Sequence, residues 1–120
     1  MRIVIVEDNR DGAESLATVL EDLGHEVTIA HDGAHALAVG PGLAPEVAFV
    51  DLLLPGMDGV EVARRFGALS PRTTLVAVTG LIAPEVRERT LAAGFAHFLL
   101  KPYSIAALEQ VLDQVAARAP

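Results

Sequence analysis

The residues most suited to chemistry are carboxylates that stand directly after short apolar runs. Glu7 and Asp8 follow residues 3–6, and Asp51 follows residues 47–50. Carboxylates that are brought close together repel one another, so that they take up protons or bind a cation. A cluster of carboxylate oxygens with few fixed ligands suits Mg²⁺, which keeps several of its waters when it binds a protein. We therefore expect a magnesium site if the fold places these runs side by side.

Two further polar side chains follow apolar runs later in the chain. Thr79 follows residues 75–78, and Lys101, the only lysine among nine basic residues, follows residues 95–100. Lysine is a compact point charge, whereas arginine is a broad planar fork. An ammonium and a hydroxyl beside carboxylates and a metal ion would compensate the charge of a phosphoryl group during an in-line transfer. The acceptor can itself be an aspartate, which forms covalent intermediates in some phosphotransfer proteins.

The elements that must position these residues are five short apolar runs that alternate with helical patterns. Most of the runs are unbroken and rich in β-branched residues, which is typical of strands buried on both faces of a parallel sheet. They are residues 3–6, 27–30, 47–50, 75–78 and 95–100. Strands that alternate with helices predict an α/β domain of five strand–helix units, with a parallel sheet covered on both faces. The alternative is half of an eight-stranded barrel, which would need a partner to close.

The intervening segments predict helices with one apolar face. In the first, that face comprises Ala13, Leu16, Ala17, Leu20 and Leu23, and Gly24 ends the helix. In the last, which Ser104 caps, it comprises Ile105, Leu108, Leu112 and Val115. Further helices are expected at residues 33–39, 58–69 and 84–93, and residues 40–45 (GPGLAP) are expected to form a loop.

Polar residues gather at one rim if the strands run in the order 2-1-3-4-5. In open α/β sheets, function lies at the carboxyl ends of the strands, near the point where the chain order reverses. This order makes the first and third strands neighbours, which brings Glu7 and Asp8 close to Asp51. Taken singly, an acid that follows a strand is more typical of a solvated loop or a helix cap than of a functional site. Their joint placement is what favours a functional site.

The composition excludes several classes of function. The chain has 120 residues, no cysteine, 52% hydrophobic residues and a net charge of −7. Disulfides, thiol catalysis and zinc–thiolate sites are therefore excluded. The acidic charge argues against binding to nucleic-acid backbones, and no apolar stretch reaches the roughly 20 residues of a membrane span. We expect residues 1–120 to form a single domain of a soluble, cytoplasmic protein without membrane association.

Four motifs taken together resemble the receiver domain of two-component response regulators over the whole chain. They are VEDN with Glu7 and Asp8, VDLLLPGMDG with Asp51, AVTG with Thr79, and LLKP with Lys101. The resemblance implies a doubly wound sheet of flavodoxin-like strand order. It also implies that a histidine kinase or a phosphotransfer protein donates a phosphoryl group. The protein would then catalyse only its own phosphorylation and dephosphorylation, and would not be an enzyme in the usual sense.

The resemblance also implies a role for each site residue. Asp51 would accept the phosphoryl group and bind Mg²⁺, for which Mn²⁺ can substitute, together with Asp8, the backbone carbonyl of Leu53 and, through water, Glu7. The residues that respond to phosphorylation would be Thr79, Lys101 and the rotating aromatic Phe98, and the bond before Pro102 would be cis. The conformational switch would change the face formed by the fourth helix, fifth strand and fifth helix. That face would bind an effector, which the sequence does not identify, or a second copy of the chain in a dimer that forms on phosphorylation.

Two rival functions stay open at this point. A hydrolytic phosphatase would need a second acid where Leu53 stands, and a protein-interaction module that is never phosphorylated would not need the full set of site residues. His31 and His35 have the spacing of a metal pair but lack a third ligand nearby. We also expect Leu53 and Leu81 to keep water away from the phosphoryl group and so to slow its loss.

Overall fold

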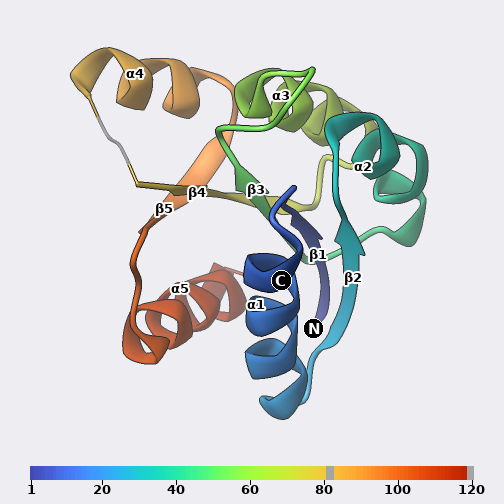
Figure 1. Cartoon of the computed structure of the whole chain (residues 1–120), viewed down its shortest axis with the longest axis vertical. Helices are drawn as coiled ribbons and strands as arrows, with labels where there is room; N and C mark the ends of the chain where they lie inside the picture. Colours follow the sequence, from blue (N-terminus) through green and yellow to red (C-terminus); the bar gives the residue numbers. More distant parts are fainter. Residues whose placement is uncertain (81–82, 119–120) are drawn as a thin grey trace.

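The structure is a computed structural model, and it describes residues 1–80 and 83–118. Five parallel strands form one open sheet in the order β2-β1-β3-β4-β5. Helices α2, α3 and α4 cover one face, and α1 and α5 cover the other (Figure 1). The predicted α/β architecture and strand order are therefore confirmed, and the half-barrel alternative is wrong.

The elements begin and end close to the predicted positions. The strands are β1 Arg2–Val6, β2 Glu26–Ala30, β3 Val47–Asp51, β4 Thr74–Thr79 and β5 Phe95–Leu100. The helices are α1 Arg10–Asp22, α2 Gly33–Val39, α3 Gly59–Leu69, α4 Pro84–Ala92 and α5 Ile105–Arg118, and Pro41–Leu43 form a 3-10 turn in the GPGLAP segment.

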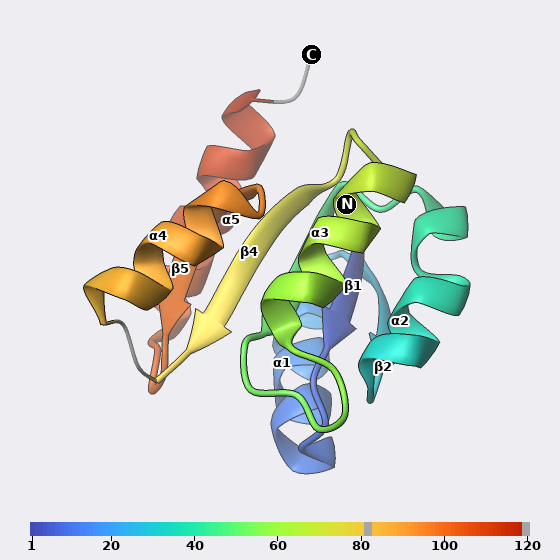
Figure 2. The same ribbon diagram turned by 90° about the horizontal axis from the view of Figure 1, so that it is seen from above.

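The sheet separates two apolar cores. Strand residues alternate between them, so that Ile3 and Ile5 pack towards α1 and α5, whereas Val4 and Val6 pack towards α2 and α3. The central strand β3 is buried along its whole length. All neighbouring strands pair in parallel, as the arrows of β1, β4 and β5 in Figure 2 show, so the carboxyl ends of the strands share one edge of the sheet. A buried, hydrogen-bonded sheet thus fixes the rim on which the polar residues stand.

Two predicted core residues lie at the surface instead. Leu23 is 42% exposed, because it follows the last residue of α1 and the chain has already left the helical path there. Gly24 then turns the chain with a positive φ of 93°. Ile105 is 57% exposed as the first residue of α5, and the buried face of that helix begins one turn later at Leu108. Among the described residues, no helix is long and apolar enough to cross a membrane.

Candidate functional site

Three carboxylates meet where β1 and β3 end. Asp51 is the last residue of β3 and is 7% exposed, and Glu7 follows β1 and is 8% exposed. The backbone N–H of Glu7 donates to the carbonyl of Ala30 at 3.0 Å, which extends the pairing of β1 with β2 by one residue. Asp8 is exposed beside them. One carboxylate oxygen from each of Glu7, Asp8 and Asp51 lies within 4.8 Å of the others.

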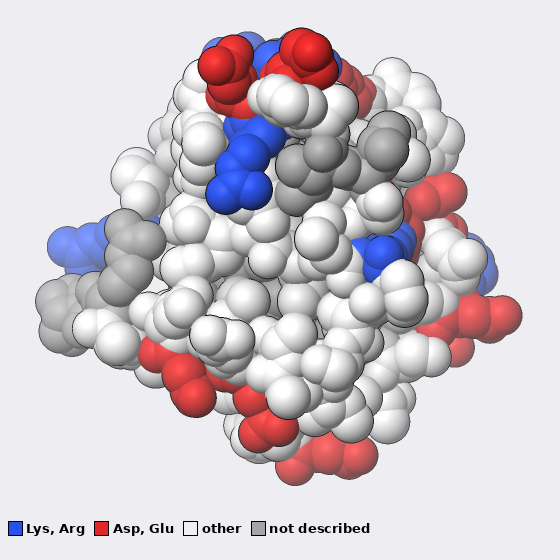
Figure 3. Space-filling model, turned by 90° about the vertical axis from the view of Figure 1, so that its left-hand side faces the viewer, with Lys and Arg blue, Asp and Glu red and all other residues white. Residues whose placement is uncertain are grey.

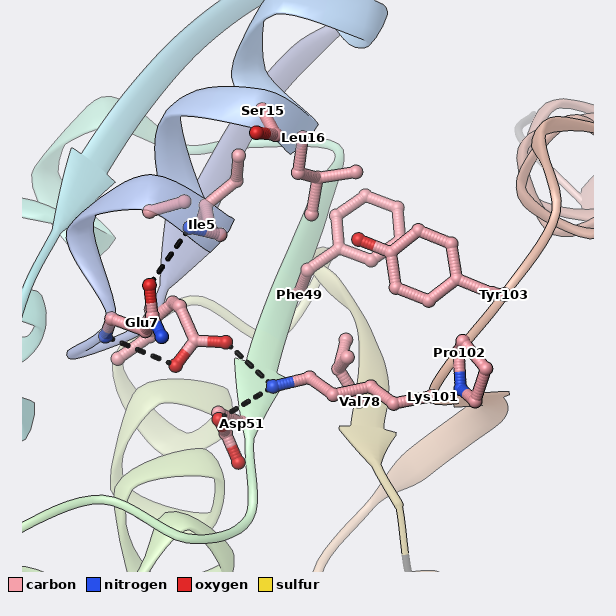
Figure 4. A pocket seen from close by; sticks show the side chains of 14 residues that line it. Ile5, Glu7, Ser15, Leu16, Phe49, Asp51, Val78, Lys101, Pro102 and Tyr103 are labelled. Carbon is pink, nitrogen blue, oxygen red and sulfur yellow. Dashed lines mark hydrogen bonds and ion pairs between the residues drawn. The ribbon is translucent and has the colours of Figure 1, made fainter.

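Lys101 reaches this cluster from the far side of β4. Its ammonium donates to Glu7 Oε1 at 2.7 Å and to Asp51 Oδ2 at 3.0 Å (Figure 4). The backbone N–H of Lys101 donates to the carbonyl of Thr79 at 2.9 Å, which fixes the start of the side chain against β4. The Lys101–Pro102 peptide bond is cis. Lys101 therefore connects the end of β5 to the acids at the ends of β1 and β3.

Burial and charge act together on these groups. Burial is the main cause that raises the pKa of the Glu7 carboxyl, and the neighbouring Asp51 raises it further, whereas Lys101 lowers it. For Lys101, burial alone would lower the pKa of the ammonium. Its hydrogen bonds to Glu7 and Asp51 and their negative charges outweigh burial, so the pKa is raised. The site thus holds buried negative charge that one internal cation compensates only in part.

The backbone after β3 fixes the Asp51 carboxylate. The backbone N–H of Leu53 donates to Asp51 Oδ1 at 2.8 Å, so the two oxygens of Asp51 accept from different elements. Gly59, at the start of α3, packs so closely that a Cβ there would collide with the carbonyl oxygen of Asp51. Asp58 caps α3, because its Oδ1 accepts from the N–H of Val60 at 2.8 Å. The first turn of α3 therefore rests directly on the end of β3.

A cavity of about 500 Å³ opens beside the acidic cluster. Figure 4 shows Glu7, Asp51 and Lys101 at one end of it, with Phe49 and Tyr103 along its wall. The cavity lies on the α1 side of the sheet, where Tyr103 packs against the core that α1 and α5 cover. The carboxylate of Asp51 thus lies at the end of a hollow that is open to solvent.

Thr79 and Phe98 lie towards α4, on the other side of the sheet. Thr79 ends β4, is 3% exposed and lines a separate groove of about 300 Å³ with Leu53 and residues of α3 and α4. Phe98 of β5 is half-buried against the core of that side. The structure therefore places both expected switch residues next to α4.

Some side chains that were singled out in the sequence lie differently from expectation. Leu53 is 73% exposed, and its expected effect on water near a phosphoryl group stays a prediction. Leu52 packs inward instead, because alternate residues of an extended segment face opposite ways. Leu81 lies outside the described residues. His31 contacts the carbonyl of Glu7 through Nδ1 at 3.2 Å, and the acidic group that could hold a metal includes neither His31 nor His35 among the described residues.

Two arginine contacts near the site could not be predicted from the sequence. Arg89 of α4 pairs with Asp58, and the guanidinium of Arg87 stacks on Phe98. The contact between Lys101 and Glu7 was not predicted either. An arginine signals no particular partner in a sequence, since its long side chain reaches several elements. From the sequence, Asp58 was predicted only to begin a helix.

Comparison with known proteins gives consistent matches. The family model of the response regulator receiver domain matches residues 3–113. The response regulator MprA of Mycobacterium avium (strain 104) is 33% identical over 117 residues, which cover 98% of this chain and 50% of MprA. The chain thus spans about half the length of the curated relatives that it matches.

Solved structures agree with the family match. Chemotaxis protein CheY4 of Vibrio cholerae has a TM-score of 0.89 and 27% identity, over 95% of this chain and 97% of that one. The receiver domain of a sensor histidine kinase from Pseudomonas aeruginosa PAO1 has a TM-score of 0.86 and 29% identity, over 96% of this chain and 97% of that one. That domain was solved with a magnesium ion coordinated in its active-site cleft.

Proposed function

Because the chain belongs to the response regulator receiver family, we propose that it signals by accepting a phosphoryl group on Asp51 from a histidine kinase or a phosphotransfer protein. The observation that carries this proposal is the position of the Lys101 ammonium between Glu7 and Asp51, next to three carboxylate oxygens that lie within 4.8 Å of one another. Such a site is suited to charge compensation around a phosphoryl group.

The residues around Asp51 support a direct displacement. An oxygen of the Asp51 carboxylate attacks the phosphorus of a phosphohistidine, a P–O bond forms, and the P–N bond breaks with its electron pair returning to the imidazole. The N–H of Leu53 and the ammonium of Lys101 already bind the two carboxylate oxygens, which orients the nucleophile before the donor arrives. After transfer, Lys101 and the hydroxyl of Thr79 would bind phosphoryl oxygens.

The donor set fits a magnesium ion. Glu7, Asp8 and Asp51 offer hard carboxylate oxygens at the spacing of one ion, and Asp8 leaves the site open to water. We propose that Asp8 and Asp51 bind Mg²⁺ directly with the backbone carbonyl of Leu53, that Glu7 binds it through water, and that Mn²⁺ substitutes. A bound divalent cation would neutralise charge that develops on the transferring group.

The output would pass through α4 and its neighbours. Thr79 and Phe98 lie on the α4 side, and we propose that movement of Thr79 towards a phosphoryl group frees space for Phe98. Figure 3 shows the face that α4, β5 and α5 form, with most acidic side chains along its borders. Leu100 and Ile105 are exposed there. An effector, or a second copy of the chain after phosphorylation, would bind this face.

The proposal is tested with a small acyl phosphate as donor. In the presence of Mg²⁺ and acetyl phosphate, intact-mass spectrometry should show the addition of one phosphoryl group. The addition should disappear with EDTA and in Asp51→Asn. If the parent gains no phosphoryl group under these conditions, the rival interpretation of an interaction module that is never phosphorylated is favoured.

A further inference from the structure

Helix α4 is held to the rest of the protein by little apolar packing. Across its nine residues, Pro84–Ala92, all of which the structure describes, only Thr90 is buried. Val86 packs in part against the core, and Leu91 is 52% exposed. Buried apolar surface is the usual source of helix anchorage. Something else must therefore contribute to the position of this helix.

A groove lies between α4 and the loop that follows β3. The groove of about 300 Å³ separates Val86 and Arg89 of α4 from the loop that follows β3, and Thr79 lies on its wall. Protein interiors are normally packed so closely that elements cannot shift without a large penalty. A groove at this place leaves room for α4 and Thr79 to rearrange.

Arg89 bridges this groove to α3. Its Nη2 donates to Asp58 Oδ2 at 2.8 Å, while Asp58 Oδ1 accepts the capping bond from the N–H of Val60. Both oxygens of one carboxylate are thus used, one for its own helix and one for α4. The ion pair ties α4 to the first turn of α3, which itself rests on Asp51 through Gly59.

Arg87 ties the same helix to β5. Its guanidinium carbon lies 4.9 Å from the centre of the Phe98 ring, which is within the range of a cation–π contact. The planar guanidinium suits stacking on a ring better than an ammonium does. Two arginines that are two positions apart therefore hold α4 to two different elements, α3 and β5.

We propose that Arg87 and Arg89 form a two-point clamp that holds α4 in its resting position and so weakens the affinity of the site for a phosphoryl group. The proposal rests on the proposed function, because Thr79 and Phe98 are the residues that would respond. A rearrangement of α4, Thr79 and Phe98 has to break both contacts. A ligand that favours the rearranged state must supply that free energy, which lowers its apparent affinity.

The test is a titration with beryllofluoride, a mimic of the phosphoryl group, in Mg²⁺, followed by amide chemical shifts. Arg87→Gln and Arg89→Gln should each lower the half-saturating concentration by about 1.5- to fivefold, the range of exposed ion pairs and cation–π contacts. Loss of a positive charge alone weakens the binding of an anion, so the sign separates release of the clamp from a simple charge effect. Arg65→Gln, which removes the same charge and breaks an ion pair with Glu61 on α3, is the matched control and should not lower the half-saturating concentration.

Combinations of the variants identify the contacts themselves. Arg87→Gln and Arg89→Gln break separate contacts, so their effects should multiply in the double variant. Asp58→Asn keeps a capping side chain for α3 but removes the partner of Arg89. In the Arg89→Gln background, Asp58→Asn should not change the half-saturating concentration further. If the Asp58 charge instead acted on the site through space, Asp58→Asn would still change that concentration in this background.

Unchanged or raised half-saturating concentrations in both arginine variants would overturn the clamp. So would a lowered melting temperature with parental affinity, because it would show that the contacts serve stability alone. Failure of the parent to bind beryllofluoride would instead contradict the proposed function, and the clamp with it.

Discussion

The ammonium of Lys101 lies closer to Glu7, at 2.7 Å, than to Asp51, at 3.0 Å. The chain that carries it comes from the end of β5, two strands away from β3 and three from β1 in the sheet. The single ammonium of Lys101 thus partly neutralises the charge of two carboxylates that come from different strands. This geometry suits a compact ammonium, in a chain whose other basic residues are all arginine.

Lys101→Arg should keep the positive charge but lose most of the response to beryllofluoride. A guanidinium is too broad for the space between Glu7 and Asp51, so that at least one charge-assisted hydrogen bond is lost. Such a bond contributes about 1.5–3 kcal/mol, which corresponds to a roughly tenfold or larger loss of affinity. Chemical-shift titration measures the loss. A parental response would show that the size of the cation is irrelevant and that the lone lysine is a matter of composition.

Gly59→Ala should destabilise the fold and distort the site. The new methyl group would collide with the backbone at Asp51, and overpacking of this kind costs about 1–3 kcal/mol. Gly67→Ala in the same helix is the control, because its Cβ would lie an ordinary 3.4 Å from Leu75 and alanine favours helix formation. Urea denaturation of both variants provides the comparison. If both variants were equally stable, a Cβ at position 59 would fit against Asp51 without a cost in stability.

The rim of the sheet could be predicted from the sequence because the pattern that sets it is local. Unbroken apolar runs fix the strands, and each polar residue that follows a run must stand at its carboxyl end. Asp51 and Thr79 are examples, since each is the last residue of its strand. The local pattern does not set the order of the strands, which the family resemblance implied and which makes β1 and β3 neighbours. Glu7, Asp8 and Asp51 meet for that reason.

The contacts of α4 could not be predicted in the same way. Arg87 and Arg89 reach partners that lie eleven or more positions away, and neither Phe98 nor Asp58 signals an arginine partner in the sequence. The exposure of side chains at the ends of helices and strands could not be predicted from the hydrophobic pattern either. Leu53 belongs to an apolar run, yet only the path of the backbone after β3 decides that it faces solvent.

The stability that Glu61 contributes should depend on pH. Hydrogen bonds from Arg64, followed by those from Arg65, lower the pKa of the half-exposed Glu61 carboxyl to about 2. Because the folded pKa lies below the ordinary value, the contribution is fully present above about 4.5 and is lost as the pH falls through 2. Glu61→Gln should therefore be slightly less stable than the parent at neutral pH and equal to it at the acid limit.

The measurement is the urea midpoint of both proteins between pH 7 and pH 2. Glu109→Gln, at an exposed acid of α5, controls for the change in net charge. A difference between Glu61→Gln and the parent that does not shrink as the pH falls would contradict the ion-pair origin of the effect.

Leu53→Asn should accelerate the loss of the phosphoryl group. The exposed side chain at this position stands beside Asp51, and an amide there can orient an attacking water, which leucine cannot. A tenfold acceleration requires only about 1.4 kcal/mol of barrier. The decay of phosphorylated protein in Mg²⁺ buffer without donor measures it, with Leu69→Asn, another exposed leucine, as the control. An unchanged decay rate in Leu53→Asn would mean that Leu53 has no influence on this step.

The central claim is that Asp51, and no other acid of the cluster, carries the phosphoryl group. After incubation with Mg²⁺ and acetyl phosphate, borohydride reduces an aspartyl phosphate to homoserine, and peptide mass spectrometry locates the changed residue. We expect homoserine at position 51, none at position 8, and none when EDTA is present. Homoserine at Asp8, or an unmodified Asp51 in protein that has gained a phosphoryl group, would contradict it.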